Sequence, residues 1–420
     1  MANETMQKAP RRYEKMRDSG VEWIGLVPEE WNILPAKKMF LEVKEKNRQN
    51  EYKNPFSFRY GEIVDKRLPG KTDAQLTETL SAYQVVMPND IVLNGLNLNY
   101  DFVTQRVAIV HNKGIITSAY LVVRPDTDKI VPRYTMYLLK AFDFRQVFHG
   151  IGSGIRKTLK YHDFKELPIL CPSEATQNAI VMYLDKKSKY IDEIIADVKT
   201  SIEEYKAWKS SIIYEAVTKG LDPTAEMKDS GVDIIGTIPA HWKSSRLKFL
   251  CSIMTGNQDT QNAFPDGEYP FYVRSPIVER SNVYTFDGEG ILMAGDGAGA
   301  GRVFHHAFGK YAIHQRVYCF YNFRETVSDY LFFYMSELFQ KEMDKGSAQS
   351  TVPSVRMPMI TNFVVCLPPI SEQNEIVAYL QKRTDSIESI IQEKEKLISD
   401  LESYKKSLIY EVVTGKRKVV

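Results

Sequence analysis

Basic side chains in loops are the residues of this sequence best suited to chemistry, because they can bind an anionic partner. They lie in segments interrupted by Gly or Pro, such as "DKRLPGK" and "GSGIRKTLK", where loops are expected. Arg and Lys can neutralise phosphates, and Arg can also make two hydrogen bonds to guanine. The candidate nucleic-acid contacts are Lys66, Arg67, Lys71, Arg156, Lys157, Lys160, Arg274, Arg302 and Arg356.

Side-chain amides and net charge add to this interpretation. The segments "GNQDTQN" and "NGLNLN" offer Asn and Gln, which can read adenine. Residues 32–165 carry 21 Lys and Arg against 13 Asp and Glu, a balance of +8, whereas residues 243–362 carry 12 of each. Exposed loops are commonly charged, so we expect about half of the candidates to contact nothing. The group therefore supports nucleic-acid binding better than any single member does.

Motifs that would indicate an enzyme are missing from the sequence. The run "GDGAGAGR" (295–302) fits neither a P-loop nor a dinucleotide fingerprint and favours a strand–turn–strand connection. The segment "NPFS" (54–57) lacks the second Pro of an adenine-methyltransferase signature. His305 and His306 are adjacent but have no evident third ligand, which favours a structural role. The sequence therefore predicts no catalytic residue, no metal ligand and no cofactor site.

Composition indicates a folded protein with a reduced interior. The 420 residues allow two or three domains, and 43% of them are hydrophobic. The four cysteines are scattered singly, so the pattern predicts neither a disulfide framework nor a zinc site. Neither a signal-peptide core nor a membrane-spanning run is evident, and we expect a cytoplasmic location.

The elements that must position these loops occur twice. "MRDSGVEWIGLVPEEW" (16–31) recurs as "MKDSGVDIIGTIPAHW" (227–242), with nine of sixteen positions identical at an offset of 211. A longer segment that begins "QNAIVMYLDKKS" at Gln177 recurs from Gln373 at an offset of 196. The second copy of the intervening block is therefore 15 residues shorter than the first. Each half of the chain consists of a phrase, a variable block with β-strand patterns, and a long repeated segment.

The long repeated segments are expected to be helices. No Pro or Gly occurs from Glu174 to Thr218, and apolar residues recur three and four positions apart. Ser173 and Ser371 are expected N-caps, and Gly220 and Gly415 expected helix-ending glycines. The predicted helix-seam residues are Leu184, Ile191, Ile194, Val198, Tyr205, Trp208 and Ile212, with Leu380, Ile387, Ile390, Leu401, Tyr404 and Leu408 in the second copy.

A helix of this length spans roughly 65 Å at 1.5 Å per residue, which constrains the topology. To bury its stripe against the first helix, the second must run antiparallel to it and bring the C-terminus back towards the N-terminus. The chain is then nearly circular, with a pseudo-two-fold axis across the helix pair. The phrase would be the joint between a returning helix and the next globular block, its Gly, Pro and Trp serving as turn and packing residues.

The doubled phrase, the two variable blocks and the helices that begin near "SEQNEIVAYL" resemble the specificity subunit of Type I restriction–modification enzymes. The resemblance covers essentially the whole chain and includes "IGTIPAHW" and the pair "IYEAVTKG" and "IYEVVTGK". One departure is Leu26-Val27 where the second phrase has Thr237-Ile238, which is a conservative difference.

The resemblance implies an α+β protein with two mixed α/β target recognition domains and two long antiparallel coiled-coil helices. Each domain would read one half of a bipartite, asymmetric DNA site. The helices would set the unread spacer and bind two modification subunits, which carry S-adenosylmethionine. Restriction subunits would add ATP- and Mg-dependent translocation and cleavage. The expected domains are 1–172, a helix at 173–219, 220–368, and a helix with tail at 369–420.

Two other classes stay open at this point. The chain could be a stand-alone DNA-modifying enzyme, which would itself bind S-adenosylmethionine. It could also be a coiled-coil scaffold without a DNA role, which would show no salt-dependent DNA binding. The recognised sequence and the spacer length do not follow from residue spacing.

Overall fold

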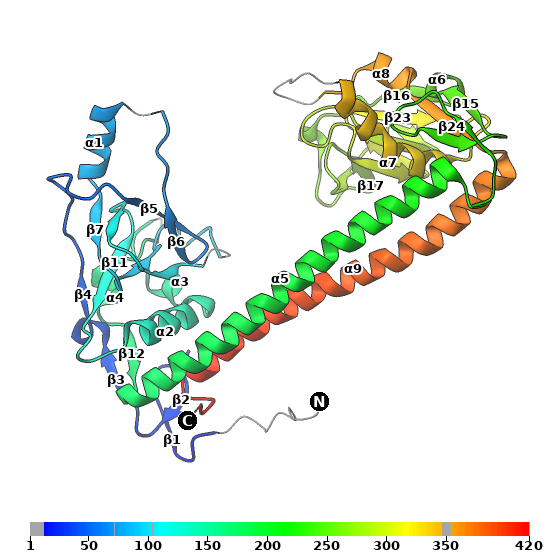
Figure 1. Ribbon diagram of the computed structural model, residues 1–420. Coiled ribbons are helices and arrows are strands. Elements are labelled where there is room, and N and C mark those ends of the chain that lie inside the picture. Colours follow the sequence, from blue (N-terminus) through cyan, green and yellow to red (C-terminus); the bar gives the residue numbers. More distant parts are fainter. Residues whose placement is uncertain (1–11, 71, 103–104, 156, 347–353, 420) are drawn as a thin grey trace. The chain divides into compact units, whose positions relative to one another are not determined.

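Two long helices connect two globular units in the computed structural model (Figure 1), which describes residues 12–70, 72–102, 105–155, 157–346 and 354–419. Unit 1 comprises residues 1–197 and 396–420, and unit 2 comprises residues 198–395. Helix α5 (Glu174–Lys219) therefore begins in unit 1 and ends in unit 2, while helix α9 (Ile370–Val413) does the reverse. Each boundary falls inside a helix rather than at its end.

Unit 1 contains two four-stranded sheets. The first is antiparallel, with spatial order β4 (Phe40–Glu42), β11 (Leu121–Pro125), β8 (Ile91–Leu93) and β9 (Val107–Ile109). The second has the order β6 (Glu62–Asp65), β5 (Pro55–Arg59), β10 (Gly114–Ile116) and β7 (Gln84–Val86), with β5 and β10 parallel. Two-stranded pairs join β1 (Met16–Asp18) to β2 (Leu26–Pro28) and β3 (Asn32–Pro35) to β12 (Pro168–Cys171). The helices are η1 (Ala36–Lys38), α1 (Asp73–Ser81), α2 (Pro132–Phe144), α3 (Val147–Ile151) and α4 (Tyr161–Phe164).

Unit 2 repeats this topology strand for strand. Its antiparallel sheet is β16 (Ser252–Thr255), β23 (Val317–Tyr321), β20 (Gly290–Ala294) and β21 (Phe304–Ala307). Its mixed sheet is β18 (Glu279–Ser281), β17 (Tyr269–Tyr272), β22 (Lys310–Ile313) and β19 (Phe286–Asp287), again with one parallel pair, β17 and β22. The pairs are β13 (Met227–Asp229) with β14 (Thr237–Pro239) and β15 (Lys243–Arg246) with β24 (Val364–Leu367). The helices are α6 (Leu247–Leu250), η2 (Thr260–Asn262), α7 (Ser328–Gly346) and α8 (Met357–Thr361).

The difference in length between the two blocks arises mainly in one connection. Residues 66–83 link β6 to β7 and contain α1, whereas residues 282–285 make the equivalent link from β18 to β19 without a helix. This connection accounts for 14 of the 15 residues by which the second block is shorter. The expected α+β architecture with two mixed domains and two long helices is therefore confirmed.

The helices run antiparallel within each unit, as expected. In unit 1, Lys405 Nζ lies 2.6 Å from Asp192 Oδ2, and in unit 2 Lys209 forms an ion pair with Glu388. The two pairs are copies of each other, because both the acids and the lysines are 196 positions apart in the sequence. In each pair an acid from one repeat meets the lysine of the other repeat. This exchange is the contact pattern that circular symmetry requires.

The predicted seam describes the buried helix faces only in part. Leu184, Ile191, Leu380, Ile387 and Leu408 are buried. Partial exposure is found at Ile194, Val198, Tyr205, Ile212, Ile390 and Leu401.

The prediction is wrong for Trp208 and Tyr404, which are 49% and 46% exposed. Ile195 and Ile202 are buried in their place on α5, so the buried stripe lies partly one position around the helix from the predicted one. Ser173 Oγ accepts the backbone N–H of Thr176 at 3.3 Å, as an N-cap does. Ser371 lies inside α9, which begins at Ile370, so it is not the N-cap.

The repeated phrase is a packed joint in both units. Trp31 and Trp242 are each only 1% exposed, and each anchors the core of its unit. In unit 1 the Tyr410 hydroxyl near the end of α9 donates to the carbonyl of Trp23 at 2.9 Å. In unit 2 Tyr214 near the end of α5 donates to the carbonyl of Ile234 at 3.0 Å. Each helix thus ends against a phrase, and the expected role of these residues in turns and packing is confirmed.

We predict that Gly415→Ala destabilises unit 1 by about 3 kcal/mol or more. Gly415 has a φ of +72°, and a Cβ there would lie 2.3 Å from Cδ of Pro28 in the first phrase. Gly20→Ala is the matched control, because Gly20 has a φ of +71° but no atom within 4 Å of an added Cβ. The control should cost only about 1–2 kcal/mol of backbone strain. Urea unfolding of the full chain measures both, and equal losses would contradict the packed joint.

Candidate nucleic-acid interface

The Gly-rich run of unit 2 is a turn between β20 and β21, which confirms the strand–turn–strand interpretation. Its glycines allow neighbouring backbone to approach closely. A Cβ at Gly299 would lie 2.6 Å from the carbonyl oxygen of Arg274, and one at Gly295 would lie 2.9 Å from that of Arg316. The small residues therefore serve packing of this turn, residues 295–302, which we call the Gly295 turn.

Four arginines belong to the Gly295 turn or to segments packed against it. Asp296 in the turn lies 2.9 Å from Arg274 Nη1 and 3.6 Å from Arg316 Nε. Arg302 ends the turn and is exposed. Arg356 is also exposed and follows Val355, whose backbone N–H donates to the Gly295 carbonyl at 2.8 Å. The structure thus brings the three predicted arginines of unit 2 to one turn and adds Arg316.

Arg316 was missed because the surrounding "AIHQRVY" contains no Gly or Pro to indicate a loop. Its side chain is nonetheless 65% exposed. The neighbouring His314 fixes the backbone here, because its Nδ1 accepts the Arg316 N–H at 3.0 Å and its Nε2 lies 3.3 Å from Thr260 Oγ1. Burial, and then the charge of Arg274, lower the pKa of His314, which favours the neutral ring needed to accept this hydrogen bond.

The amide-rich segment "GNQDTQN" lies beside the same turn. The backbone N–H of Gln315 donates to the Gln258 carbonyl at 2.8 Å, and the Gln315 side chain donates to Asp259 Oδ2 at 2.6 Å. Asn257 and Gln261 are exposed. Arginine and amide side chains, the two groups that read guanine and adenine edges, therefore share one region of unit 2.

Unit 1 has an equivalent turn, residues 94–101, which follows β8 as the Gly295 turn follows β20. The Leu159 N–H donates to the Gly95 carbonyl at 2.9 Å, which matches the bond from Val355 to Gly295. Lys157 and Lys160 lie in the segment that makes this bond, and both are exposed. Tyr100 and Ile155, at 79% and 97% exposed, add apolar surface.

A buried arginine supports the turn of unit 1 by donating hydrogen bonds to its backbone carbonyls. Arg106 is 1% exposed and donates Nη1 to the carbonyls of Asn94 and Leu96 at 2.8 and 2.9 Å. Its Nη2 donates to the Asp101 carbonyl at 2.6 Å, and its backbone N–H donates to Asp143 Oδ2 at 2.7 Å. Burial raises the pKa of Asp143 to about 6 despite this hydrogen bond.

The other candidates of unit 1 lie elsewhere or outside the described residues. Lys66 and Arg67 belong to the connection between β6 and α1. This connection follows the mixed sheet of unit 1, whereas the turn of residues 94–101 follows a strand of the antiparallel sheet. The Lys66 ammonium donates to the Tyr83 hydroxyl at 2.8 Å and is partly buried, whereas Arg67 is exposed. Lys71 and Arg156 lie outside the described residues. Which candidates contact a nucleic acid stays a prediction.

The two adjacent histidines face different partners. His305 Nε2 lies 3.1 Å from the Ser275 carbonyl, while His306 lies 3.0 Å from Glu289 and from Asp329. In the described part of the chain, no group of three or more His, Cys, Asp or Glu side chains could hold a metal ion. Within the same described ranges, no helix is long and apolar enough to cross a membrane.

Comparisons with known proteins agree on one family. A family model described as "Type I restriction modification DNA specificity domain" matches residues 239–399. The Type I restriction enzyme EcoDI specificity subunit of Escherichia coli is 28% identical over 183 residues, 43% of this chain but only 39% of that protein. The Type I restriction enzyme MjaVIII specificity subunit of Methanocaldococcus jannaschii is 22% identical over 419 residues, covering 94% of each chain.

One solved structure supports the fold. Its title is "Structural basis underlying complex assembly and conformational transition of the type I R-M system", and one of its chains superposes with a TM-score of 0.68. The superposition covers 92% of this chain and 98% of that one at 15% identity. At this identity the likeness shows the arrangement of elements and nothing further.

We predict that Asp143→Asn removes a pH dependence from the stability of unit 1. Protonation of Asp143 is favoured in the folded state, because its pKa rises from 3.8 to about 6 on burial. Its contribution is fully present below about pH 4 and is lost as pH rises through 6. The variant should therefore match wild type near pH 4 and exceed it by up to about 3 kcal/mol at pH 7.5. Urea unfolding at both pH values tests this, with exposed Asp65→Asn as the control; a pH-independent difference would contradict it.

Proposed function

Because the chain belongs to the family of Type I restriction–modification specificity subunits, we propose that it selects the DNA sequence on which such a complex acts. Each unit reads one half of a bipartite, asymmetric site. The observation that carries this proposal is the duplicated unit, in which the same strand end presents a loop of different residues each time. Matching scaffolds place the two readers alike, and the unlike loops give the two half-sites different sequences.

The loops of unit 2 provide the chemistry for direct readout. Arg274 and Arg316 can each offer two donors to a guanine edge, and Asn257 can pair with adenine in the major groove. Asp296 holds both guanidinium groups in the free chain, so DNA must compete with one carboxylate for them. This competition limits binding to arbitrary phosphates, because a partly neutralised arginine gains less from a sequence-independent contact.

The loops of unit 1 use a different set. Lys157 and Lys160 suit phosphate contacts, since a lysine ammonium acts as a point charge without the planar fork of arginine. Exposed Asn97 in the turn of residues 94–101 offers an amide, and Tyr100 offers a ring that can contact base edges. Lys66 and Arg67 remain candidates for the flanking backbone, and Lys71 and Arg156 stay candidates from the sequence alone.

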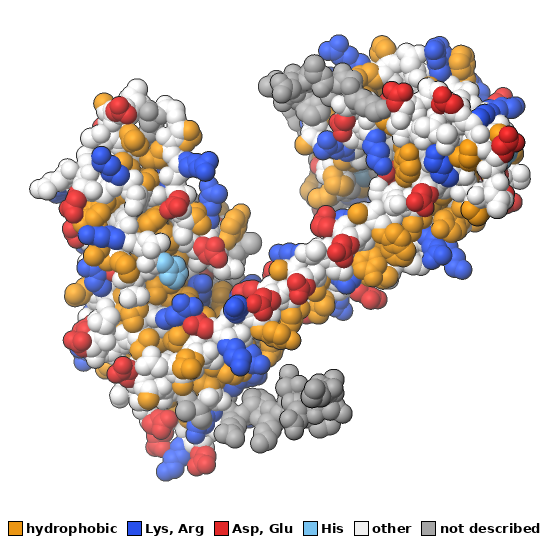
Figure 2. Space-filling model, viewed as in Figure 1, with side chains coloured by type: hydrophobic (Ala, Val, Ile, Leu, Met, Phe, Trp, Pro, Cys, Tyr) orange, Lys and Arg blue, Asp and Glu red, His pale blue; other side chains and the backbone are white. Residues whose placement is uncertain are grey.

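We propose that the long helices set the unread spacer and dock two modification subunits. Trp208 in unit 2 and Tyr404 in unit 1 occupy equivalent repeat positions, and both are about half exposed. Figure 2 shows hydrophobic side chains on the solvent-facing side of the helices. Equivalent exposed aromatic residues in the two units suit two copies of the same partner, since aromatic anchors dominate the energetics of protein interfaces.

We assign the chemistry of the complex to partner subunits. S-adenosylmethionine would bind the modification subunits, and ATP and Mg the restriction subunits, while this chain contributes no catalytic residue. We expect the complex to act in the cytoplasm, because its proposed substrate is cellular DNA.

We predict that replacing residues 32–165 with the corresponding block of another specificity subunit changes one half of the methylated site and leaves the other half unchanged. The reason is that each half-site would contact the loops of one unit only. Methylation-site sequencing of a host carrying the exchanged subunit with its modification subunit measures the outcome. The reciprocal exchange of residues 243–362 is the matched control and should change the other half. A change in both halves of the methylated site after one exchange would contradict the proposal that each unit reads one half-site.

We predict that inserting one heptad into both α5 and α9 lengthens the unread spacer while both half-sites persist. A heptad adds roughly 10 Å of helix and preserves the a/d register of the buried stripe. Inserting the heptad into α5 alone is the control, because it disrupts pairs such as Lys405 with Asp192 and should abolish methylation. An unchanged spacer in the methylome of the double-insertion strain would contradict the role of the helices.

A further inference from the structure

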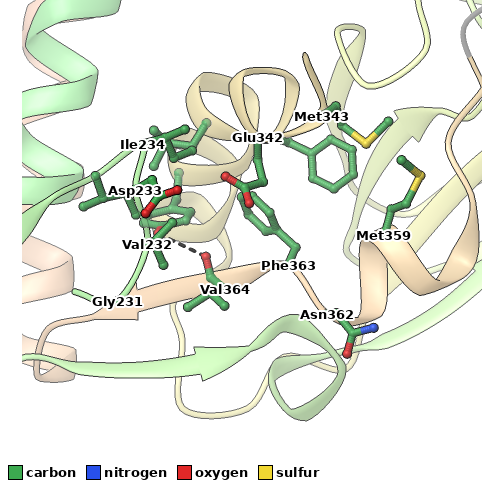
Figure 3. A pocket seen from close by; sticks show the side chains of 14 residues that line it. Gly231, Val232, Asp233, Ile234, Glu342, Met343, Met359, Asn362, Phe363 and Val364 are labelled. Atoms are coloured by element: carbon green, nitrogen blue, oxygen red, sulfur yellow. Dashed lines mark hydrogen bonds between the residues drawn. The ribbon is translucent and has the colours of Figure 1, made fainter. Parts of the chain in front are cut away.

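A pocket of about 380 Å³ opens in unit 2 (Figure 3), and one of its lining residues, Phe339, also packs near Gly301 of the Gly295 turn. Its walls come from the loop of the second phrase, from α7, from α8, and from the residues that lead into β24. Apolar side chains dominate the lining, among them Ile234, Phe339, Met343, Met359 and Phe363. The size lies within the range of specific ligand pockets, which measure about 300–1,000 Å³.

Unit 1 fills the equivalent place with its own side chain. Ile234 corresponds to Trp23 in the first phrase, and the Trp23 ring packs edge-on against Phe142 with centroids 4.4 Å apart. Phe142 corresponds to Leu338, which lines the pocket of unit 2. Replacement of Trp by Ile and Phe by Leu removes these two rings from the second copy, whereas Phe339 and Phe363 of the lining stand where unit 1 has Asp143 and Leu167. The pocket thus occupies a position where this fold accommodates an indole ring.

A second difference extends the pocket wall. Helix α2 ends at Phe144, and Gln146 has a left-handed φ of +57°. Helix α7 continues through the corresponding positions to Gly346, which places Glu342 and Met343 on the wall. Unit 1 has a neutral Gln146 where unit 2 has Glu342, so the additional wall brings a negative charge.

The pocket lining includes two acidic side chains and two flexible methionines. Figure 3 shows the carboxylates of Asp233 and Glu342 on two sides of the same space, with the thioethers of Met343 and Met359 opposite. Met359 is 38% exposed, and flexible methionines are typical of surfaces that receive a partner's side chain. The hydroxyl of Tyr334, another lining residue, donates to the Val364 carbonyl at 3.1 Å and links α7 to β24.

We propose that this pocket receives an aromatic side chain of a partner protein, with a Lys or Arg of the same segment beside the rim. The ring replaces the indole that unit 1 supplies from within, and the basic residue faces Asp233 and Glu342. Because the Trp23 ring packs against Phe142 at this place in unit 1, the partner binds one unit of the chain and not the other. An otherwise symmetric pair of supports thereby gains one asymmetric docking site.

Two tripeptide probes test this on the full chain, acetylated and amidated Lys-Trp-Lys and Glu-Trp-Glu, with binding followed by titration NMR. Lys-Trp-Lys should bind at least ten-fold more tightly than Glu-Trp-Glu. Ile234→Trp should abolish binding of both, since the new indole fills the pocket as Trp23 fills its equivalent. Glu342→Gln should weaken Lys-Trp-Lys and bring the two affinities closer.

Phe308→Trp is the matched control, because it adds an indole at an exposed position of unit 2 outside the pocket lining and should leave binding unchanged. Binding that persists in Ile234→Trp, or equal affinity for both peptides, would overturn the proposal. Tryptamine binding as tightly as Lys-Trp-Lys would also overturn it and indicate a small-molecule site. DNA binding by Ile234→Trp should equal that of wild type, so this proposal and the DNA role fail separately.

Discussion

Each long helix begins in the core of one unit and ends in the core of the other, and the rest of the structure depends on this exchange. Ile180 and Leu184 of α5 are buried in unit 1, while Ile213 and Val217 of the same helix are buried in unit 2. Helix α9 makes the complementary contribution, with Ile376 in unit 2 and Leu408 in unit 1. Each such side chain contributes about 1.5–3 kcal/mol on burial, so neither core is complete without both helices.

Buried tyrosines make this dependence specific as well as hydrophobic. The Tyr134 hydroxyl donates to the Leu170 carbonyl at 2.9 Å and lies 3.5 Å from the carbonyl of Val413 at the end of α9. Tyr330 repeats the arrangement with Cys366 and with Val217 at the end of α5. A hydroxyl without a partner in a dry core costs about 1–3 kcal/mol, so a helix end displaced along its axis is penalised. The joints therefore hold each helix end in a defined position.

Most of the fold could be predicted from the repetition in the sequence, because two copies of one pattern are expected to fold alike. The periodicity of the helices and the positions of Gly220 and Gly415 were visible without any structure. The exposed side of the helices was not, since Trp208 and Tyr404 fit the apolar spacing as well as Ile195 and Ile202 do. Hydrophobic spacing does not distinguish a seam residue from an exposed aromatic residue. The amphipathic ring of Trp or Tyr is suited to either environment.

The candidate site was predictable to the extent that its loops carry Gly or Pro. Arg274, Arg302 and Arg356 were found in this way, although they are distant in the sequence, and only the sheet order brings them to one turn. Arg316 lacks such a signal, and the supporting role of Arg106 depends on burial that a strand pattern does not reveal.

The backbone contacts of the turns explain how the two units can differ in sequence. Hydrogen bonds such as Val355 to Gly295 and Leu159 to Gly95 use only backbone atoms, so the turn keeps its position when the side chains at its exposed positions change. A substitution at an exposed turn position therefore changes the free energy of unfolding only slightly. The joint residues, by contrast, are constrained by a core to which both halves of the chain contribute. A scaffold of this kind can change what it reads without changing where it reads.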